Sequence, residues 1–105
     1  MNADRQNPYD SAYAIEIIDD AMTPRVRRGY GAHVSPIMAP VPGDLVLIKI
    51  DSSDGVIGFV RNLVSMDERS VVTSMLNPER TDTFDRHKVV AVDRIFQVGV
   101  REYML

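Results

Sequence analysis

The segment LVLIKIDSSDGVIGFVRNLV, residues 45–64, carries the clearest signal of the fold class. Its first six residues form a nearly continuous apolar run, broken only by Lys49, which is typical of a strand buried on both faces. Residues 51–55 are expected to form a hairpin loop in which Asp54 and Gly55 supply the turn. Residues 56–64 then return as a second strand, so a β-hairpin is expected at the centre of the structure.

Five further short strands are expected outside this hairpin. They cover residues 13–17, 30–34, 71–75, 89–92 and 95–101. Their close spacing, with turn signals between them and no βαβ alternation, indicates an all-β fold rather than a parallel sheet. In the last strand, alternation places one set of side chains on one face, Phe96, Val98 and Val100, and a second set on the other, Ile95, Gln97 and Gly99.

Three connecting segments have distinct signals. Thr23 and Pro24 match a helix N-cap followed by proline at the first helical position, and Gly29 limits this helix to about one and a half turns. Residues 35–43 contain three prolines and are expected to form an irregular connection. Residues 81–87 are polar and are expected to form a loop. The expected fold class is therefore all-β with one short helical turn.

Length and composition fit one small domain. The chain has 105 residues, of which 45% are hydrophobic and 26% charged, so a single domain over residues 13–105 is expected after a flexible polar arm over residues 1–12. The arm lacks the apolar core of a signal peptide, and no apolar run is long enough to cross a membrane. The absence of cysteine fits a cytoplasmic protein. The net charge of −3 argues against direct binding to nucleic acid.

The titratable residues suggest two metal sites, each with a simpler alternative. His87 with Asp82 and Asp85 has ligands that zinc accepts, but exposed histidines at positions 33 and 87 are the better interpretation. The second candidate is an acidic cluster of Glu16, Asp19 and Asp20. Its carboxylates are ligands for a hard cation; the simpler interpretation is a solvated strand end and turn. No metal and no cofactor are therefore expected.

Two further segments have a similar pair of interpretations. The basic cluster of Arg25, Arg27 and Arg28 suits contacts with phosphate, but a solvated face beside acidic neighbours is favoured in an acidic chain. Residues 36–42 suit a polyproline II ligand or, more simply, a stiff connection between strands.

Six segments along the chain carry a resemblance to a known family. They read AIEIIDDAMTP (14–24), RGYGAHVSP (28–36), PGDLVLI (42–48), GFVRNL (58–63), LNP (76–78) and VDRIFQVGV (92–100). In this order and spacing they resemble the C-terminal self-cleavage domain of LexA and the phage repressors. The resemblance covers about residues 13–101 and implies the β-rich, signal-peptidase-like fold of that family.

Members of that family cut a peptide bond in their own linker with a Ser-Lys dyad. A serine hydroxyl needs a base, and a lysine is a base only when burial lowers its pKa. The serine position here is Ala21, which has no hydroxyl, and the lysine position is Arg61, whose guanidinium stays protonated. Thr23, Lys49 and Lys88 are poor substitutes, because the threonine is expected to cap the turn and the lysines to reach solvent. No catalytic residue is therefore expected.

The resemblance implies a non-catalytic dimerisation domain of a phage-type repressor. In the family this domain pairs two subunits so that their N-terminal DNA-binding heads reach adjacent half-sites, and twelve residues before Tyr13 are too few for such a head. DNA is thus expected to be contacted only indirectly. A homodimer is expected through the last strand, since an apolar strand near the chain end suits a sheet edge. The expected interface residues are Ile95, Phe96, Gln97, Val98 and Val100.

Two alternatives to this function stay open. The chain is then either an inactive variant of a self-cleaving Ser-Lys peptidase, or an accessory subunit resembling the processed subunit of an error-prone DNA polymerase. The polymerase subunit has the same fold and a short arm but keeps the dyad.

Overall fold

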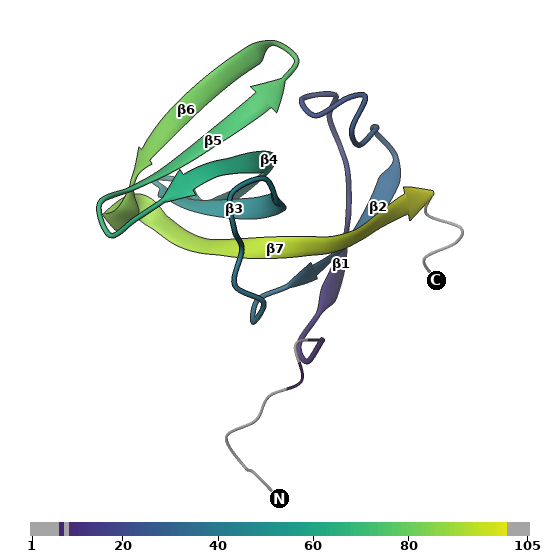
Figure 1. The fold of residues 1–105 in the computed structure, drawn as a ribbon, viewed down its shortest axis with the longest axis horizontal. Coiled ribbons are helices and arrows are strands. Elements are labelled where there is room, and N and C mark those ends of the chain that lie inside the picture. Colours follow the sequence, from purple (N-terminus) through teal and green to yellow (C-terminus); the bar gives the residue numbers. More distant parts are fainter. Residues whose placement is uncertain (1–6, 8, 101–105) are drawn as a thin grey trace, which may run out of the picture.

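The computed structural model of the chain describes residue 7 and residues 9–100 (Figure 1). As expected, the fold is all-β. Seven strands form one antiparallel sheet in the order β1-β2-β7-β3-β4-β5-β6, with one 3-10 turn, η1, in the described part of the chain. The elements are β1 (Tyr13–Glu16), β2 (Tyr30–Ser35), β3 (Leu45–Ser52), β4 (Gly55–Met66), β5 (Ser70–Leu76), β6 (Glu79–Asp85), η1 (Arg86–Lys88) and β7 (Val89–Val100).

The central hairpin is formed by β3 and β4. Side chains of β3 alternate between two apolar clusters, which confirms a strand buried on both faces. The first cluster contains Ile17, Ala21, Met22, Val26, Ala32, Val34, Leu45, Leu47, Met75 and Ile95. The second contains Val46, Ile48, Leu63 and Val71. At the turn, Gly55 has a φ of 112°, which glycine adopts without the steric cost of a side chain.

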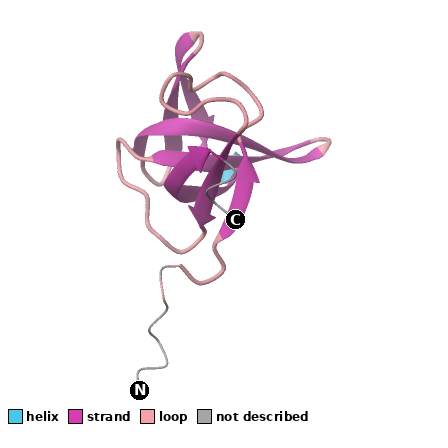
Figure 2. Ribbon diagram, turned by 90° about the vertical axis from the view of Figure 1, so that its right-hand side faces the viewer, coloured by secondary structure: helices cyan, strands magenta, loops and turns pink. Residues whose placement is uncertain are grey.

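Strand β7 joins the two parts of a strongly curved sheet. Its first half pairs with β3 and its second half with β2, and the change of partner falls at Arg94. In Figure 1 this strand runs across the whole molecule, and Figure 2 shows hairpin ends projecting from the curved sheet. The hydrogen-bond ladders thus connect β1 and β2 to the other strands only through β7 within the described residues.

The helical turn predicted after Thr23 is wrong. This segment forms turns in which the Thr23 N–H donates to the Asp20 carbonyl and the Val26 N–H to the Met22 carbonyl, both at 3.1 Å. The Thr23–Pro24 peptide is cis. The Thr23 hydroxyl donates to the Val26 carbonyl at 3.4 Å and so caps no N–H. Met22 and Val26 are 2% and 1% exposed, so burial of these two side chains shapes the segment.

The loop predicted over residues 81–87 is also wrong, because most of it belongs to β6. This outermost strand pairs with β5 from Ser70 opposite Asp85 to Leu76 opposite Glu79. Its side chains are mostly exposed, and from this strand only Phe84 packs against the second cluster. An edge strand is held by backbone hydrogen bonds and tolerates polar side chains, so the hydrophobic pattern did not reveal it.

The last two predicted strands are one continuous strand, β7. It lies in the interior of the sheet order, between β2 and β3, so the expected edge position is wrong for the strand as a whole. Residues 95–100 nevertheless pair only with β2, and no described strand pairs with their other side.

A β-bulge at Phe96 corrects the predicted faces of this strand. The register passes from His33 opposite Gln97 to Val34 opposite Ile95, so Phe96 has no partner in β2. The extra residue shifts the alternation of side chains. Ile95 therefore faces the first cluster, and Val98, opposite the cluster member Ala32, lies on the same face rather than the opposite one.

Residues 1–6 and 8 of the predicted arm, and residues 101–105, lie outside the described residues. The described part of the arm forms two successive turns, in which the Asp10 N–H donates to the Asn7 carbonyl at 2.9 Å and the Ala12 N–H to the Tyr9 carbonyl at 3.1 Å. The Tyr9 ring rests edge-on against Phe96, with 5.1 Å between ring centroids. The described part of the arm thereby contacts the bulge of β7.

Candidate functional site

Ala21, at the family's serine position, lies in the turn segment between β1 and β2. It is 6% exposed, and its methyl group belongs to the first cluster. Its N–H donates to the Asp19 carboxylate at 3.1 Å, and its carbonyl accepts the N–H groups of Leu76 at 2.8 Å and Asn77 at 3.0 Å. The Asn77 side-chain amide also donates to the Thr23 carbonyl at 2.7 Å. The segment is thus tied to the turn between β5 and β6, beside which it lies in Figure 1.

Two arginines of the predicted basic cluster are engaged within the fold. Arg25 donates to the Asn62 side chain at 2.8 Å and to the Gly43 carbonyl at 3.0 Å. Arg28 pairs with Asp20 at 3.4 Å, with both side chains exposed. Arg25 therefore helps to hold the turn segment on the sheet, and the simpler interpretation of this cluster is favoured over a phosphate site.

Arg61, at the family's lysine position, is only 8% exposed. Its Nη1 donates to the Val60 carbonyl at 2.8 Å. Its Cζ lies over the Phe59 ring, 5.1 Å from the ring centroid. No described carboxylate forms an ion pair with it. Burial lowers the pKa of the Arg61 guanidinium, while the charge of Asp19 acts to raise it. Asp19 also accepts the N–H of Ala21, but no ion pair among the described residues joins this carboxylate to Arg61.

A groove of about 380 Å³ lies next to these positions, between the β1 segment and the first half of β4. Its lining is mostly apolar and consists of Ile15, Glu16, Ile17, Ile18, Asp19, Leu47, Ile57, Gly58, Phe59 and Val60. Arg61 is not among the lining residues. Its cross-strand partner Val46 belongs to the second cluster, whereas its neighbour Val60 packs against the first. A Cβ at Gly58 would lie 3.3 Å from Cδ1 of Leu47. The absence of a side chain at Gly58 therefore lets β4 lie close to Leu47 of β3.

Both walls of the groove come from strands with an uncovered edge. Strand β1 pairs only with β2, and residues 55–61 of β4 pair only with β3 among the described strands. Strand β5 joins β4 from Asn62 onward. No described strand therefore pairs with these edges, on β4 as far as Arg61.

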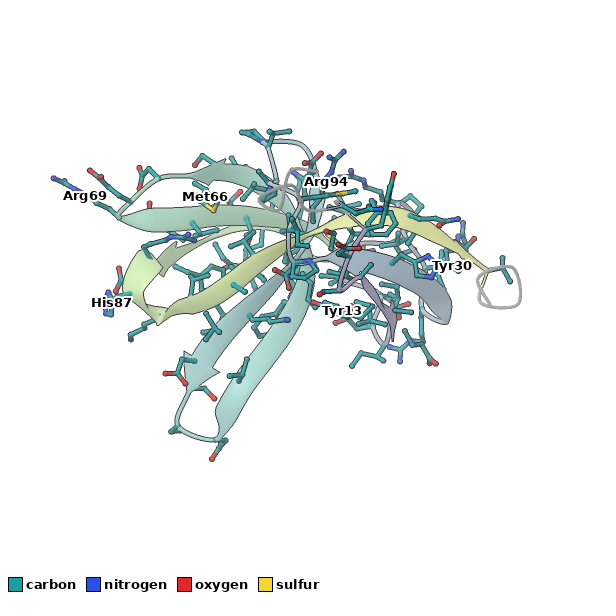
Figure 3. The ribbon with its side chains drawn as sticks, turned by 90° about the horizontal axis from the view of Figure 1, so that it is seen from below. Tyr13, Tyr30, Met66, Arg69, His87 and Arg94 are labelled. Atoms are coloured by element: carbon teal, nitrogen blue, oxygen red, sulfur yellow. The ribbon has the colours of Figure 1, made fainter. Side chains whose placement is uncertain are left out.

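Lys49 was expected to reach solvent, but its side chain is partly buried and pairs with Asp93. Its ammonium lies 3.1 Å from the Asp93 carboxylate, and the exposed fractions of the two side chains are 30% and 6%. The Tyr13 hydroxyl donates to the same carboxylate at 2.8 Å, and the Lys49 ammonium lies 4.9 Å from the centre of the Tyr13 ring. Tyr13 is labelled in Figure 3, where it lies close to the middle of the molecule.

This cluster favours the charged form of Lys49. Contacts with Tyr13 and Asp93 raise the pKa of Lys49, and burial raises the pKa of Tyr13. The raised pKa disfavours the neutral amine that a general base needs, and Lys88 is exposed as expected. Sequence reasoning missed Asp93, although a lone carboxylate between Val92 and Ile95 in an apolar strand was a signal that it has a buried partner.

The five predicted interface residues of β7 lie in different surroundings. Ile95 is 7% exposed and belongs to the first cluster, whereas Val98 and Val100 are 37% and 42% exposed. Phe96 and Gln97 face neighbours within the chain.

An aromatic stack accounts for Phe96 and Gln97. The Phe96 ring stacks on His33 with 6.0 Å between centroids and also contacts Tyr9. The His33 Nδ1 lies 3.1 Å from Oε1 of Gln97. Val98 and Val100 are therefore the two predicted interface residues that combine apolar character with exposure.

The structure does not assemble either alternative metal site. Among the described residues, no three His, Asp or Glu side chains are grouped to hold an ion. Asp82 pairs with Arg80 at 3.0 Å, and His87 is exposed. In the same part of the chain, no helix has the length and apolarity needed to span a membrane.

Comparison with known proteins points to a phage repressor. Over 94 residues the chain is 35% identical to Repressor protein C of Rhizobium phage 16-3, and the aligned region is 85% of this chain but 36% of that protein. No family model matches the chain, and no solved structure matches it. The similarity supports the phage-repressor part of the resemblance, for a chain that spans 36% of the length of that relative.

Proposed function

We propose that the chain is a phage-repressor-type domain that pairs two subunits and cuts no peptide bond. The observation that carries the proposal is the similarity to Repressor protein C, which favours this role over that of a polymerase accessory subunit. Phage-type repressors with a helix-turn-helix bind paired half-sites as dimers. The net charge of −3 suits a domain that contacts DNA only through another part of a repressor, in the cytoplasm.

The second half of β7 is the proposed pairing surface. Residues 95–100 have one side without a described strand partner, and Val98 and Val100 are partly exposed beside it. An uncovered apolar strand invites pairing with a second copy. Pairing about a two-fold axis uses the same surface on both subunits and closes at two copies.

Light scattering or sedimentation at tens of micromolar tests this pairing. The parent chain is expected to be a dimer, and Val98→Asp with Val100→Asp is expected to give a folded monomer. Val90→Asp is the matched control, because Val90 is 55% exposed in the first half of the same strand. Gln97 is a poorer probe since it contacts His33. A monomeric parent, or a dimer that tolerates the double change, contradicts the proposal.

The absence of peptidase activity is the second part of the proposal. Ala21 offers no nucleophile, and the Arg61 guanidinium stays protonated and cannot serve as a base. The parent chain is expected to cut no supplied peptide with a small residue before glycine, even at alkaline pH. The double change Ala21→Ser with Arg61→Lys is the variant in which some cleavage is expected. Steady turnover by the parent, followed by mass spectrometry, contradicts this part.

A further inference from the structure

We propose that the bulge of β7 is a seat for the arm that precedes β1. Tyr9 docks on Phe96 at this seat and thereby holds residues 9–12 as a strap with a fixed position on the domain. Phe96 belongs to residues 95–100 of β7, the segment that is proposed to pair two subunits. The strap itself stands on contacts within one chain, and only its consequence for a pair of subunits rests on the proposed function.

The first argument is how the bulge builds the seat. The register of β7 against β2 passes from Gln97 directly to Ile95, so Phe96 is an extra residue without a partner in β2. Ile95 belongs to the first cluster, whereas the Phe96 ring stacks on His33 with 6.0 Å between ring centroids. Oε1 of Gln97 lies 3.1 Å from Nδ1 of the same histidine. The bulge thus directs two successive side chains to one histidine ring, and re-aiming a side chain in this way is a known role of bulges.

The second argument is that Tyr9 reaches this seat past a whole strand. The arm leads into β1, and β2 lies between β1 and β7 in the sheet order. The Tyr9 ring nevertheless lies edge-on against Phe96, with 5.1 Å between centroids and 70° between the ring planes. Edge-on pairs at this distance are attractive, because the positive edge of one ring meets the negative face of the other. The contact therefore joins the arm to β7, although the arm leads into a strand two positions away in the sheet.

The third argument is the backbone of the strap. Ser11 is exposed and has a φ of 62°, a left-handed conformation that is unfavourable for a residue with a Cβ atom. The Ala12 N–H donates to the Tyr9 carbonyl at 3.1 Å and closes the turn that contains Ser11. An unfavourable conformation persists where the surrounding structure holds it. The contact of the Tyr9 ring adds such a hold from outside the arm.

The strap has a consequence for a pair of subunits. Because the seat lies on the pairing segment of β7, two-fold pairing places both seats, and with them both straps, near the axis that relates the two copies. The segments that precede Tyr9 in the two chains then begin at fixed points close to each other. A fixed, short separation raises the effective concentration of one segment relative to the other, whereas loose arms let their starting points spread apart. The strap therefore restricts where the two N-terminal segments begin.

Spin labelling followed by electron paramagnetic resonance tests the strap. The sequence has no cysteine, so Asp10→Cys gives a single, exposed labelling site in the strap, and the label is expected to be immobilised. Tyr9→Ala removes the docking ring and is expected to raise the ratio of mobile to immobilised label about two- to tenfold, the range for loss of one aromatic contact. Ser11→Val opposes the left-handed backbone without touching the ring and is expected to act in the same direction. Tyr9→Phe keeps the ring and is the matched control, expected to leave the spectrum unchanged.

Combined changes test whether Tyr9 and Phe96 act on each other. Phe96→Leu keeps an apolar side chain but removes the ring of the seat, so it is expected to release the label as Tyr9→Ala does. The double change is expected to release it no further, because a contact that is already lost cannot be lost again. Additive release in folded chains overturns the seat. A label that is mobile before any change, or that Tyr9→Ala leaves immobilised, overturns it as well.

The variant Val98→Asp with Val100→Asp, which is expected to be monomeric, separates the strap from pairing. A label that stays immobilised in this variant supports a seat filled by Tyr9 of the same chain. Release of the label in this variant means that the docked ring came from a second copy, and it overturns the strap. In the paired parent, distances between the two labels are expected to form one narrow distribution, which Tyr9→Ala broadens. A broad distribution in the dimeric parent overturns the consequence for a pair. A monomeric parent contradicts pairing through β7, and the mobility of the label still decides the strap.

Discussion

Lys49 and Arg61 lie on the two strands of one hairpin, but of the two only Lys49 has an ion-pair partner among the described residues. Lys49 has the Asp93 carboxylate at 3.1 Å and the Tyr13 ring beside it. Arg61 is more deeply buried and has one hydrogen bond to a carbonyl oxygen, the Phe59 ring beside it and no ion pair among the described residues, although the charge of Asp19 acts on it. A compensated cation supports the fold, whereas an uncompensated one costs stability. The contrast separates an ion-paired cation from a buried cation without an ion pair on neighbouring strands.

The largest expected effect comes from removing the compensation at Lys49. Asp93→Asn leaves the Lys49 ammonium without its carboxylate. The free energy of unfolding is expected to fall by roughly 2 kcal/mol. This value is smaller than that for a fully buried pair, because Lys49 is partly exposed. Urea unfolding followed by circular dichroism measures it. Asp20→Asn breaks the exposed pair with Arg28 and is expected to cost less than about 0.5 kcal/mol. Equal losses in the two variants would remove the distinction.

A smaller change of opposite sign is expected at Arg61. Arg61→Met removes a buried charge and keeps most of the side-chain volume, so the free energy of unfolding is expected to stay the same or rise by about 1 kcal/mol. The same urea experiment measures this change. A loss of more than about 1 kcal/mol would mean that the fold already compensates this guanidinium, and the contrast with Lys49 would fail.

The smallest effect is confined to alkaline pH. The pKa values of Tyr13 and Lys49 are raised above their ordinary values of 10.0 and 10.5, so the folded chain holds these protons more tightly than the unfolded chain. Their stabilisation is complete below those ordinary values and is lost as the pH rises through the raised ones. The free energy of unfolding is therefore expected to decline above about pH 10. Tyr13→Phe with Lys49→Met should flatten this decline, and an unchanged slope would contradict the assignment.

Apolar alternation predicted most strands, because those strands bury at least one face. It identified the β3 and β4 hairpin and the burial of β3 on both faces. It failed at β6, whose backbone pairing needs no apolar side chains. It also failed at Phe96, because one inserted residue changes which side chains face the core. A bulge leaves no mark in the composition of a strand.

The candidate site was only partly predictable. Ala21 and Arg61 were identified by resemblance, since each lies within a recognisable short motif. The Tyr13 contact with Asp93 joins residues 80 positions apart, and no local pattern reports such a contact. The groove also escaped prediction, because it depends on which strand edges the sheet order leaves uncovered.

The place of β7 in the sheet has a consequence for biosynthesis. Of the seven strands it is the last to leave the ribosome, yet it lies between β2 and β3. Synthesis proceeds at about 5–20 residues per second, so for a short time the edges of β2 and β3 that pair with β7 are without this partner. Such edges are sites of misassembly until they are paired. Release of β7 is therefore the event that completes this seven-stranded sheet, and ribosomal stalling before Val89 would leave the sheet unfinished.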